Sequence, residues 1–305
     1  MAICKLLLRN LVLQMPLTLT DYAWQKATLM QKFNFYIAKV PFLKRRILKS
    51  IGTNNLYIKC AGLESDRNPD AERKTSIYPV IIDKPDFAKI RQACKAKQVS
   101  VYSAIQTAAS QAICEMIVQE ASKRRIPVDE LTKTYVMCAA AVNRDDVISR
   151  DDRSYVSAAV YVILHDIDVM AYCNSSATFW QRAQAAHRNI RRNVDVQPMH
   201  GVNFVSAMLG HMDRVFSTRA SHPIELTNLG NCNYLNRHRV AGLKITAHFS
   251  TVALHHAGPV FAHSTTSVDD KLCWSVAYFP NVTTKEPAVR YLHRSVEILL
   301  ESCQN

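Results

Sequence analysis

Apolar residues recur with helical spacing early in the chain and then give way to alternating strand and helix patterns. Between residues 29 and 51 they repeat every three or four positions on one face, interrupted at Pro41, which predicts helix. Residues 64–76 contain no large apolar side chain and predict a linker. We therefore expect a helical segment over residues 1–63, the linker, and a subdomain over residues 77–305.

Beyond the linker, the pattern predicts a mixed α/β architecture in which a mixed β-sheet is layered with helices. Strands are expected at residues 77–82, 135–142, 155–164, 224–227, 243–254 and 272–279. Helices are expected at residues 86–97, 101–119, about 176–194, 202–213 and 286–302. With 305 residues, 48% of them apolar, such a chain can bury a sizeable core.

Individual residues locate some of these elements more closely. Pro79 cannot donate to a strand ladder, which predicts an edge strand or a bulge. Ser100 is typical of the N-cap of a long helix. The predicted strands at 135–142 and 155–164 are apolar on both faces, as expected of strands covered on both sides. Residues 243–250 instead alternate apolar and polar, which predicts a strand with one face in water.

The net charge of +13 favours anionic partners, such as nucleic acid, an acidic membrane surface or a phosphorylated cofactor. The basic clusters at residues 44–46, 123–125 and 191–192 lie far apart and lack the aromatic and glycine patterns of RNA-binding modules. We interpret them as solvated helix faces and ends, and we expect no nucleic-acid partner.

The sequence also bears on location. It holds no run of roughly 18 apolar residues, so no membrane-spanning helix is expected. Its nine cysteines include no Cys-x-x-Cys pair, which is typical of free thiols in a reducing compartment. The apolar stretch in the first 19 residues is broken by charged and polar side chains and has no clear cleavage pattern. We expect a cytoplasmic protein.

The sharpest local motif is Leu226-Thr227-Asn228-Leu229-Gly230. It predicts a strand end that enters a turn, because Asn tolerates unusual backbone angles and Gly allows another chain or a ligand to approach closely. Taken alone it is a common turn sequence, so its meaning depends on the elements around it.

The order of those elements resembles the chloramphenicol-acetyltransferase-like superfamily of CoA-dependent acyltransferases. A long helix precedes a strand that ends in Val142-Asn143-Arg144, and a second buried strand and two helices follow. Then come the Thr-Asn-Leu-Gly motif, a long strand, the strand from Lys271 to Tyr278 and a closing helix. The most similar branches are the condensation domains, the alcohol acetyltransferases and the mycobacterial dimycocerosyl transferases. The resemblance covers roughly residues 77–302 and corresponds to the C-terminal half of that fold, with an N-terminal helical remnant before it.

This resemblance implies two similar mixed α/β halves with a tunnel between them, which an acyl thioester enters from one side and an alcohol or amine from the other. It implies substrate-binding positions facing the tunnel at Asn143, Arg144, Thr227, Asn228 and Gly230. Arg144 or a nearby lysine would hold a phosphate of acyl-CoA, because cationic side chains bind phosphate oxygens. Acyl-CoA enters here as a substrate, and no resident cofactor is expected.

The chain lacks the catalytic motif of that family. In such enzymes the second histidine of His-His-x-x-x-Asp acts as the general base, a task suited to an imidazole whose pKa lies near neutrality. The one doublet among the eleven histidines, His255-His256, is followed by Val260 where the aspartate would stand. We therefore expect no catalytic residue of this kind and no turnover by the chain as given.

Several explanations of the missing motif stay open: a truncated gene product, a degenerate paralogue or an incomplete gene model. The alternative function is a non-catalytic protein that holds an acyl ligand or pairs with a complete transferase chain. A metal site built from His238, His248, His255 and His263 lacks characteristic spacing and a nearby carboxylate, so no metal is expected. Phosphate-binding glycine loops and the Gly-x-Ser-x-Gly nucleophile turn are absent, which leaves nucleotide and serine hydrolysis unsupported.

Overall fold

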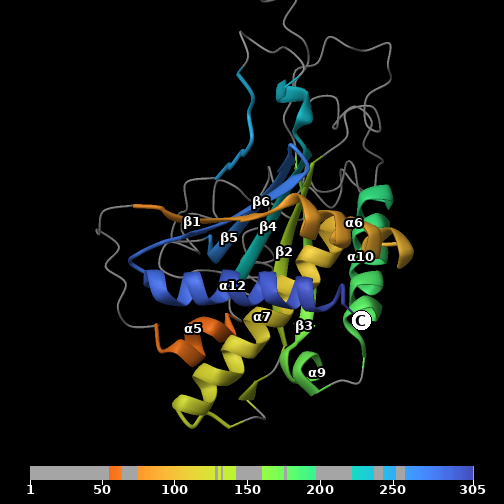
Figure 1. Cartoon of the computed structure of the whole chain (residues 1–305). Helices are drawn as coiled ribbons and strands as arrows, with labels where there is room; N and C mark the ends of the chain where they lie inside the picture. The colour runs from red at the N-terminus through yellow and green to blue at the C-terminus, as the bar shows by residue number, and fades with distance from the viewer. Residues whose placement is uncertain are drawn as a thin grey trace, which may run out of the picture.

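The computed structural model describes residues 55–63, 74–127, 130–131, 133–141, 160–174, 177–196, 222–236, 243–251 and 258–304. In this part of the chain one six-stranded mixed sheet carries a layer of helices (Figure 1). The long helix α7 (Val101–Lys123) is central in that layer, where it contacts strand β4 and five other helices. The predicted mixed sheet layered with helices is therefore confirmed.

The sheet has the strand order β1-β6-β5-β4-β2-β3. The central pairs β5–β4 and β4–β2 are parallel, whereas the outer pairs β1–β6, β6–β5 and β2–β3 are antiparallel. The strands are β1 (Ser76–Ile82), β2 (Lys133–Ala141), β3 (Val160–Asp168), β4 (His222–Asn231), β5 (Pro259–Val268) and β6 (Lys271–Tyr278). Pro79 lies in β1, at one edge of the sheet, as its missing N–H predicts.

The helices begin and end where local chemistry predicts. The Ser100 side chain accepts a hydrogen bond from Ser103 N over 3.0 Å and caps α7, which confirms the predicted N-cap. The helix α12 packs against α7 through apolar positions that repeat every three or four residues, such as Tyr291, Leu292 and Ile298. The described helices are α5 (Leu56–Ala61), α6 (Lys84–Ala96), α7, α9 (Val169–Asn174), α10 (Phe179–Val196) and α12 (Lys285–Glu301).

Side chains on the strands alternate between two faces of the sheet. Phe261 and His263 of β5 point to the helices, since both rings contact Tyr291 of α12. Ser264 and Thr266 therefore point to the opposite side, which we call the second face. The second face of β5 and β6 carries small or hydroxyl side chains: Ala262, Ser264, Thr266, Cys273, Ser275 and Ala277.

Residues 243–251, which we call the strap, run over this second face without forming a strand, so the strand predicted at 243–254 is wrong in this part. His248 lies at the level of Thr266, whose Oγ1 donates to His248 O. Ser250 lies two positions further along, where Ser275 Oγ donates to Ser250 O over 3.3 Å. The strap is thus extended, but side chains rather than strand backbone hold it. The reason is that both edges of β5 and β6 are already paired within the sheet.

The strand that the pattern missed is β5. Its second half, from Ser264 to Ser267, consists of hydroxyl residues and is typical of a loop, yet Ser264, Thr265 and Thr266 are buried. Those hydroxyl groups bond to Ser250, Asn228 and the backbone of the strap. Contacts distant in the sequence therefore make this segment a core strand.

Several predicted segments lie outside the described residues: the helices before residue 55, linker residues 64–73, the strand positions 155–159 and the helix at 202–213. The division into helical segment, linker and subdomain stays a prediction. Helix α5, which precedes the linker, packs against α7, and Tyr57 contacts Phe261 with ring centroids 5.4 Å apart. None of the described helices combines the length and apolar character needed to cross a membrane.

Candidate functional site

The Thr227-Asn228-Leu229-Gly230 motif forms a bulge inside β4, and not the turn after a strand that its sequence predicts. Pairing with β5 holds to Asn228 opposite Thr265 and resumes at Gly230 opposite Thr266, so Leu229 is the extra residue. Gly230 has a φ of +72°, in the left-handed region that favours glycine. The strand continues beyond the motif because β5 remains beside it as a pairing partner.

Asn228 holds the bulge in shape. Its Oδ1 accepts hydrogen bonds from Gly230 N over 3.0 Å and from Thr265 Oγ1 over 3.1 Å. That oxygen is therefore used by the fold. Next to it the surface is open, because the Leu229 side chain is 49% exposed and a Cβ at Gly230 would meet no atom within 4 Å. Another molecule can therefore approach the chain at Leu229, whereas Gly230 N–H already donates to Asn228 and Gly230 O accepts from Ser267 Oγ over 3.5 Å.

The other predicted site residues, Asn143 and Arg144, lie outside the described residues. The strand that leads to them, β2, runs parallel to β4 with Ala139 opposite Thr227. Neighbouring parallel strands have their carboxyl ends on the same side of a sheet, so the end of β2 at Ala141 lies on the same side as the bulge near the end of β4. Thr227, Asn228 and Gly230 thus lie in the bulge near the carboxyl end of β4. The position of Asn143 and Arg144 beside them stays a prediction.

The hydroxyl groups near the strap are held by the protein itself. The Oγ atoms of Ser250 and Ser264 are 2.6 Å apart, and Ser275 Oγ donates to Ser250 O. Thr266 Oγ1 donates to the strap backbone. These hydroxyls fix the strap to the sheet, and no described histidine bonds to any of them through its ring, so none is arranged as an activated nucleophile.

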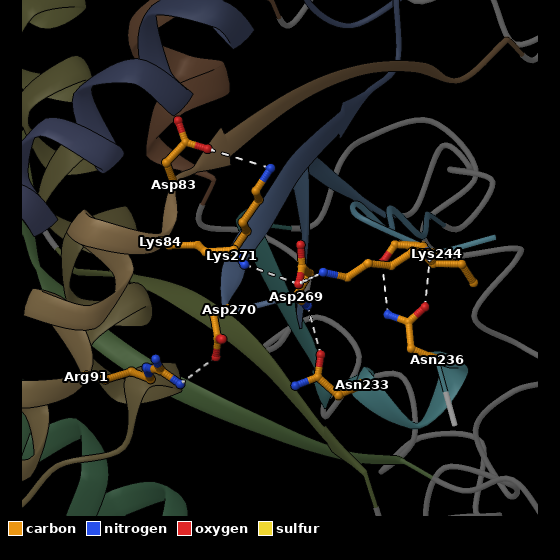
Figure 2. Close-up of polar contacts among 10 residues, drawn as sticks. Asp83, Lys84, Arg91, Asn233, Asn236, Lys244, Asp269, Asp270 and Lys271 are labelled. Atoms are coloured by element: carbon orange, nitrogen blue, oxygen red, sulfur yellow. Dashed lines mark hydrogen bonds and ion pairs between the residues drawn. The ribbon is translucent and has the colours of Figure 1, made fainter. Parts of the chain in front are cut away.

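A polar cluster pins the start of the strap (Figure 2). Asn236, at the end of the 3-10 helix η2 (Asn233–Asn236), accepts from Ile245 N over 2.8 Å and donates to Ile245 O over 2.9 Å. Asp269, in the turn between β5 and β6, forms ion pairs with Lys244 of the strap and Lys84 of α6. The hydrogen bond from Lys244 is the main reason why the pKa of Asp269 is lowered. One carboxylate therefore links the strap, the sheet and a helix.

His263, whose side chain is buried between the sheet and the helices, has no access to a substrate. Trp274 Nε1 donates to His263 Nδ1 over 2.9 Å, and His263 Nε2 lies 2.8 Å from Tyr291 Oη. Tyr291 Oη in turn donates to Ala109 O over 3.2 Å, so His263 Nε2–H donates to Tyr291. Burial lowers the pKa of His263 to about 3. This neutral imidazole is a structural link between the sheet and two helices.

Two further histidines bond within the helical layer. Burial lowers the pKa of His165 to about 4, and its ring bonds to Asn189 of α10. His187 Nδ1 accepts from Ser100 N over 3.4 Å and lies 3.3 Å from Ser103 Oγ. The Ser103 side chain is fully buried, so this serine–histidine contact supports the cap of α7 and offers no exposed nucleophile.

His248 is the described histidine closest to the hydroxyl groups of the second face. Its backbone bonds to Cys273 and Thr266, while its Nδ1 is buried and without a hydrogen-bond partner. Its signal in the sequence is weak: the alternating pattern of residues 243–250 groups His248 with Lys244 and Ser250 on the polar side. The doublet His255-His256 lies outside the described residues.

The described residues contain no group of three side chains able to hold a metal ion. Two members of the combination considered from the sequence, His248 and His263, lie on opposite faces of the sheet, since His263 bonds to Tyr291 and His248 lies over Thr266. The other two, His238 and His255, lie outside the described residues.

Comparison with known proteins identifies the fold. No family model and no curated protein sequence matches the chain. The condensation domain of the Monacolin K polyketide synthase matches with a TM-score of 0.55 and 11% identity over 80% of this chain. The trichothecene 15-O-acetyltransferase from Fusarium sporotrichioides gives a TM-score of 0.54 and 12% identity over 75% of this chain. A cyclization-docking bidomain from Sorangium cellulosum gives a TM-score of 0.54 and 13% identity over 85% of this chain.

The chain spans about half the length of these solved structures. The matched part covers 52% of the condensation domain, 47% of the acetyltransferase and 51% of the bidomain. At these identities the likeness is one of fold, and chemistry has to be argued from the residues of this chain.

Proposed function

The chain has the fold of condensation domains and of an O-acetyltransferase, and from this premise we propose that it binds an acyl thioester such as acyl-CoA. The observation that carries the proposal is the open bulge at Leu229 and Gly230. The extra residue of the bulge, Leu229, has no partner in the β5 ladder, and the pantetheine arm of a thioester has two amide groups that can bond to its peptide groups. Thr227 and Asn228 border that site. Asn143 and Arg144 follow β2 in the sequence, and we expect them to lie near the same site.

We further propose that the chain as given does not transfer the acyl group to its alcohol or amine acceptor. Transfer needs a base within hydrogen-bond reach of the acceptor. Among the described histidines, His165, His187 and His263 are engaged in internal hydrogen bonds, and the His-His-x-x-x-Asp motif is absent from the sequence. His222 lies 3.7 Å from Glu225, and His293 bonds to Tyr78. His248, whose Nδ1 has no hydrogen-bond partner, and the doublet His255-His256 are the imidazoles that the test addresses.

Binding tests the first part. Titration calorimetry with acetyl-CoA is expected to detect binding that is weakened about tenfold by Gly230→Val, because a branched side chain in a left-handed conformation distorts the bulge. Gly62→Val is the control for a left-handed glycine away from the bulge, since Gly62, with φ +65°, ends α5, where a side chain also has to displace the Arg124 guanidinium. Equal loss in both variants, or none in Gly230→Val, would contradict a site at the bulge.

Turnover tests the second part. Release of free thiol from acyl-CoA in the presence of alcohol or amine acceptors is expected to stay at the rate without protein. The same assay on His248→Ala and His256→Ala shows whether a base was overlooked. Turnover that disappears in either variant would overturn the proposed inactivity and identify the base.

A second candidate function, pairing with a complete transferase chain, is favoured by apolar side chains that the strap leaves in water. Leu243 is 75% exposed, Ile245 40% and Phe249 39%. Such a cluster is typical of a protein contact. Light scattering of the chain mixed with an intact condensation domain would test it, with Leu243→Ser and Phe249→Ser as variants that should abolish a complex. A cytoplasmic location also remains part of the proposal, in keeping with the seven free cysteines of the described residues.

A further inference from the structure

The fold brings two basic segments together that are far apart in the sequence. Helix α10 lies along the connection between α6 and α7 (Figure 1), where Gln184 Nε2 donates to Lys97 O over 3.1 Å. Arg188 follows Gln184 by one helical turn, and Arg191 and Arg192 follow Arg188 by another. Lys97 and these arginines therefore lie along one continuous stretch of surface.

The cations on this stretch point into water. Ala183, Ala186 and Ile190 bury the other side of α10, and Arg188, Arg191 and Arg192 are exposed. Lys95 and Lys97 at the end of α6 are exposed as well. Within the described part of the chain none of these five side chains forms an ion pair. We call Lys95, Lys97, Arg188, Arg191 and Arg192 the basic stripe.

Cations that cluster without an ion pair repel one another and destabilise the helix that carries them. Arg188 is three residues from Arg191 and four from Arg192, and like charges at these spacings destabilise a helix. Several other cations of the described residues are balanced by a carboxylate: Arg91 pairs with Asp270, Lys123 with Glu120, and Arg294 with Glu115. The stripe would be relieved by an anionic surface placed against it.

We propose that the basic stripe is a docking surface for an acidic helix of a partner protein. Carboxylates three and four residues apart on a helix match the spacing of Arg188, Arg191 and Arg192 on α10, and guanidinium groups bind carboxylates in pairs of hydrogen bonds. This inference goes beyond acyl-thioester binding and does not depend on it.

The surroundings of the stripe favour this occupant over other anions. The large apolar side chains exposed in the described residues lie on β1, β4, η2 and the strap, and none lies on α6 or α10. A membrane-binding helix inserts apolar side chains, and a single-stranded nucleic acid stacks on exposed aromatic rings. The stripe offers charge alone, which predicts a transient complex that weakens with salt.

The test uses the full chain and a fluorescent helical peptide whose glutamates repeat at positions i, i+4 and i+7 on one face. Fluorescence anisotropy at 50 mM and 300 mM salt should show binding that weakens with salt and falls about tenfold or more in the double variant Arg188→Glu, Arg192→Glu. Arg125→Glu with Lys285→Glu is the matched control, because it changes the net charge equally at exposed positions away from α10. Thermal unfolding of each variant checks that the fold is intact, and the double variant should be at least as stable as the parent chain.

Three results would overturn the proposal. One is equal loss of binding in the control, which would make net charge the cause. Another is equal affinity for a peptide with the same glutamates spread around the helix. The third is tighter, arginine-dependent binding to a DNA duplex or to phosphatidylserine vesicles, which would assign the stripe to a different partner.

Discussion

Trp274 donates a hydrogen bond from its indole Nε1 to Nδ1 of His263 over 2.9 Å, in the fully buried layer between the sheet and the helices. This bond fixes the proton of His263 on Nε2, which faces Tyr291. The three side chains come from β6, β5 and α12, so the contact ties two strands to the closing helix. The polar atoms are satisfied only while the imidazole stays neutral.

Stability is therefore expected to fall in mild acid. The folded-state pKa of His263 is about 3, below its unfolded value, so the unfolded state binds the proton more readily. The contribution of His263 to the free energy of unfolding is fully present above about pH 6.5 and decreases as the pH falls. At pH 5 about 2 kcal/mol of this contribution is lost. His165, with a pKa lowered to about 4, acts in the same direction. Urea unfolding at pH 7.5 and pH 5 measures the difference.

Two variants assign that effect. His263→Gln can accept from Trp274 and donate to Tyr291 but does not titrate, so it should reduce the pH dependence by about 2 kcal/mol. His293→Gln is the control for the substitution itself, because His293 lies exposed on the outer side of α12, where its ring bonds to Tyr78. An unchanged pH dependence in His263→Gln would contradict the role given to this residue.

The cap of α7 gives a second prediction. Ser100→Ala removes the hydrogen bond to Ser103 N and should lower the free energy of unfolding by about 1 kcal/mol. Ser100→Asn keeps an acceptor at this position and should retain most of the stability. Denaturant unfolding of both variants provides the measurement, and equal losses would show that the side-chain oxygen is not what stabilises the helix.

Removal of the contacts that hold residues 244 and 245 should make the strap more mobile. Asn236→Ala removes both hydrogen bonds to the backbone of Ile245, so the Ile245 amide is expected to exchange its hydrogen faster. Asp269→Ala releases Lys244 and should have the same effect. Asp270→Ala serves as the control, since Asp270 pairs with Arg91 of α6 and does not touch the strap through that ion pair. Equal hydrogen-exchange rates of the Ile245 amide in all variants would show that Asn236 and Asp269 do not hold the strap.

The bulge in β4 requires glycine for its backbone angle. Gly230→Ala should destabilise the protein by about 1 kcal/mol, because an L-residue is strained at φ +72° even though a Cβ there has open space. Gly230→Asn should cost less, since Asn adopts left-handed angles more readily than Ala. Thermal unfolding compares them, and a neutral Gly230→Ala would mean that the bulge adapts.

Local chemistry predicted much of the fold. The spacing around Val101 to Lys123, the cap at Ser100 and the edge position of Pro79 each depend on neighbours within a few residues or on a missing N–H. Such features depend on nearby residues, so the sequence alone located five of the six described strands and the long helices. The predicted bounds of β1, β2 and β6 agree with the structure closely, whereas β3 extends to Asp168 and β4 runs from His222 to Asn231, beyond the predicted ends at 164 and 227. The predicted site residues Thr227, Asn228 and Gly230 belong to the bulge in β4, and their part in binding a substrate stays a prediction.

The remaining features depend on contacts between distant segments. Ser264, Thr265 and Thr266 form a buried strand only because Ser250, Asn228 and the strap supply their hydrogen bonds. The segment 243–251 has the alternation of a strand, but β5 and β6 have no free edge, so it lies over the sheet.

Periodicity, caps and turn residues by themselves determined that this chain forms a mixed sheet layered with helices, because those signals act over a few residues. Tertiary structure alone decided that the Thr227 to Gly230 motif is a bulge, that His263 is a buried neutral link, and that Lys97 and Arg188 share one surface. Each of these depends on which segments meet across the fold, and a pairing between distant residues leaves no local pattern in the sequence.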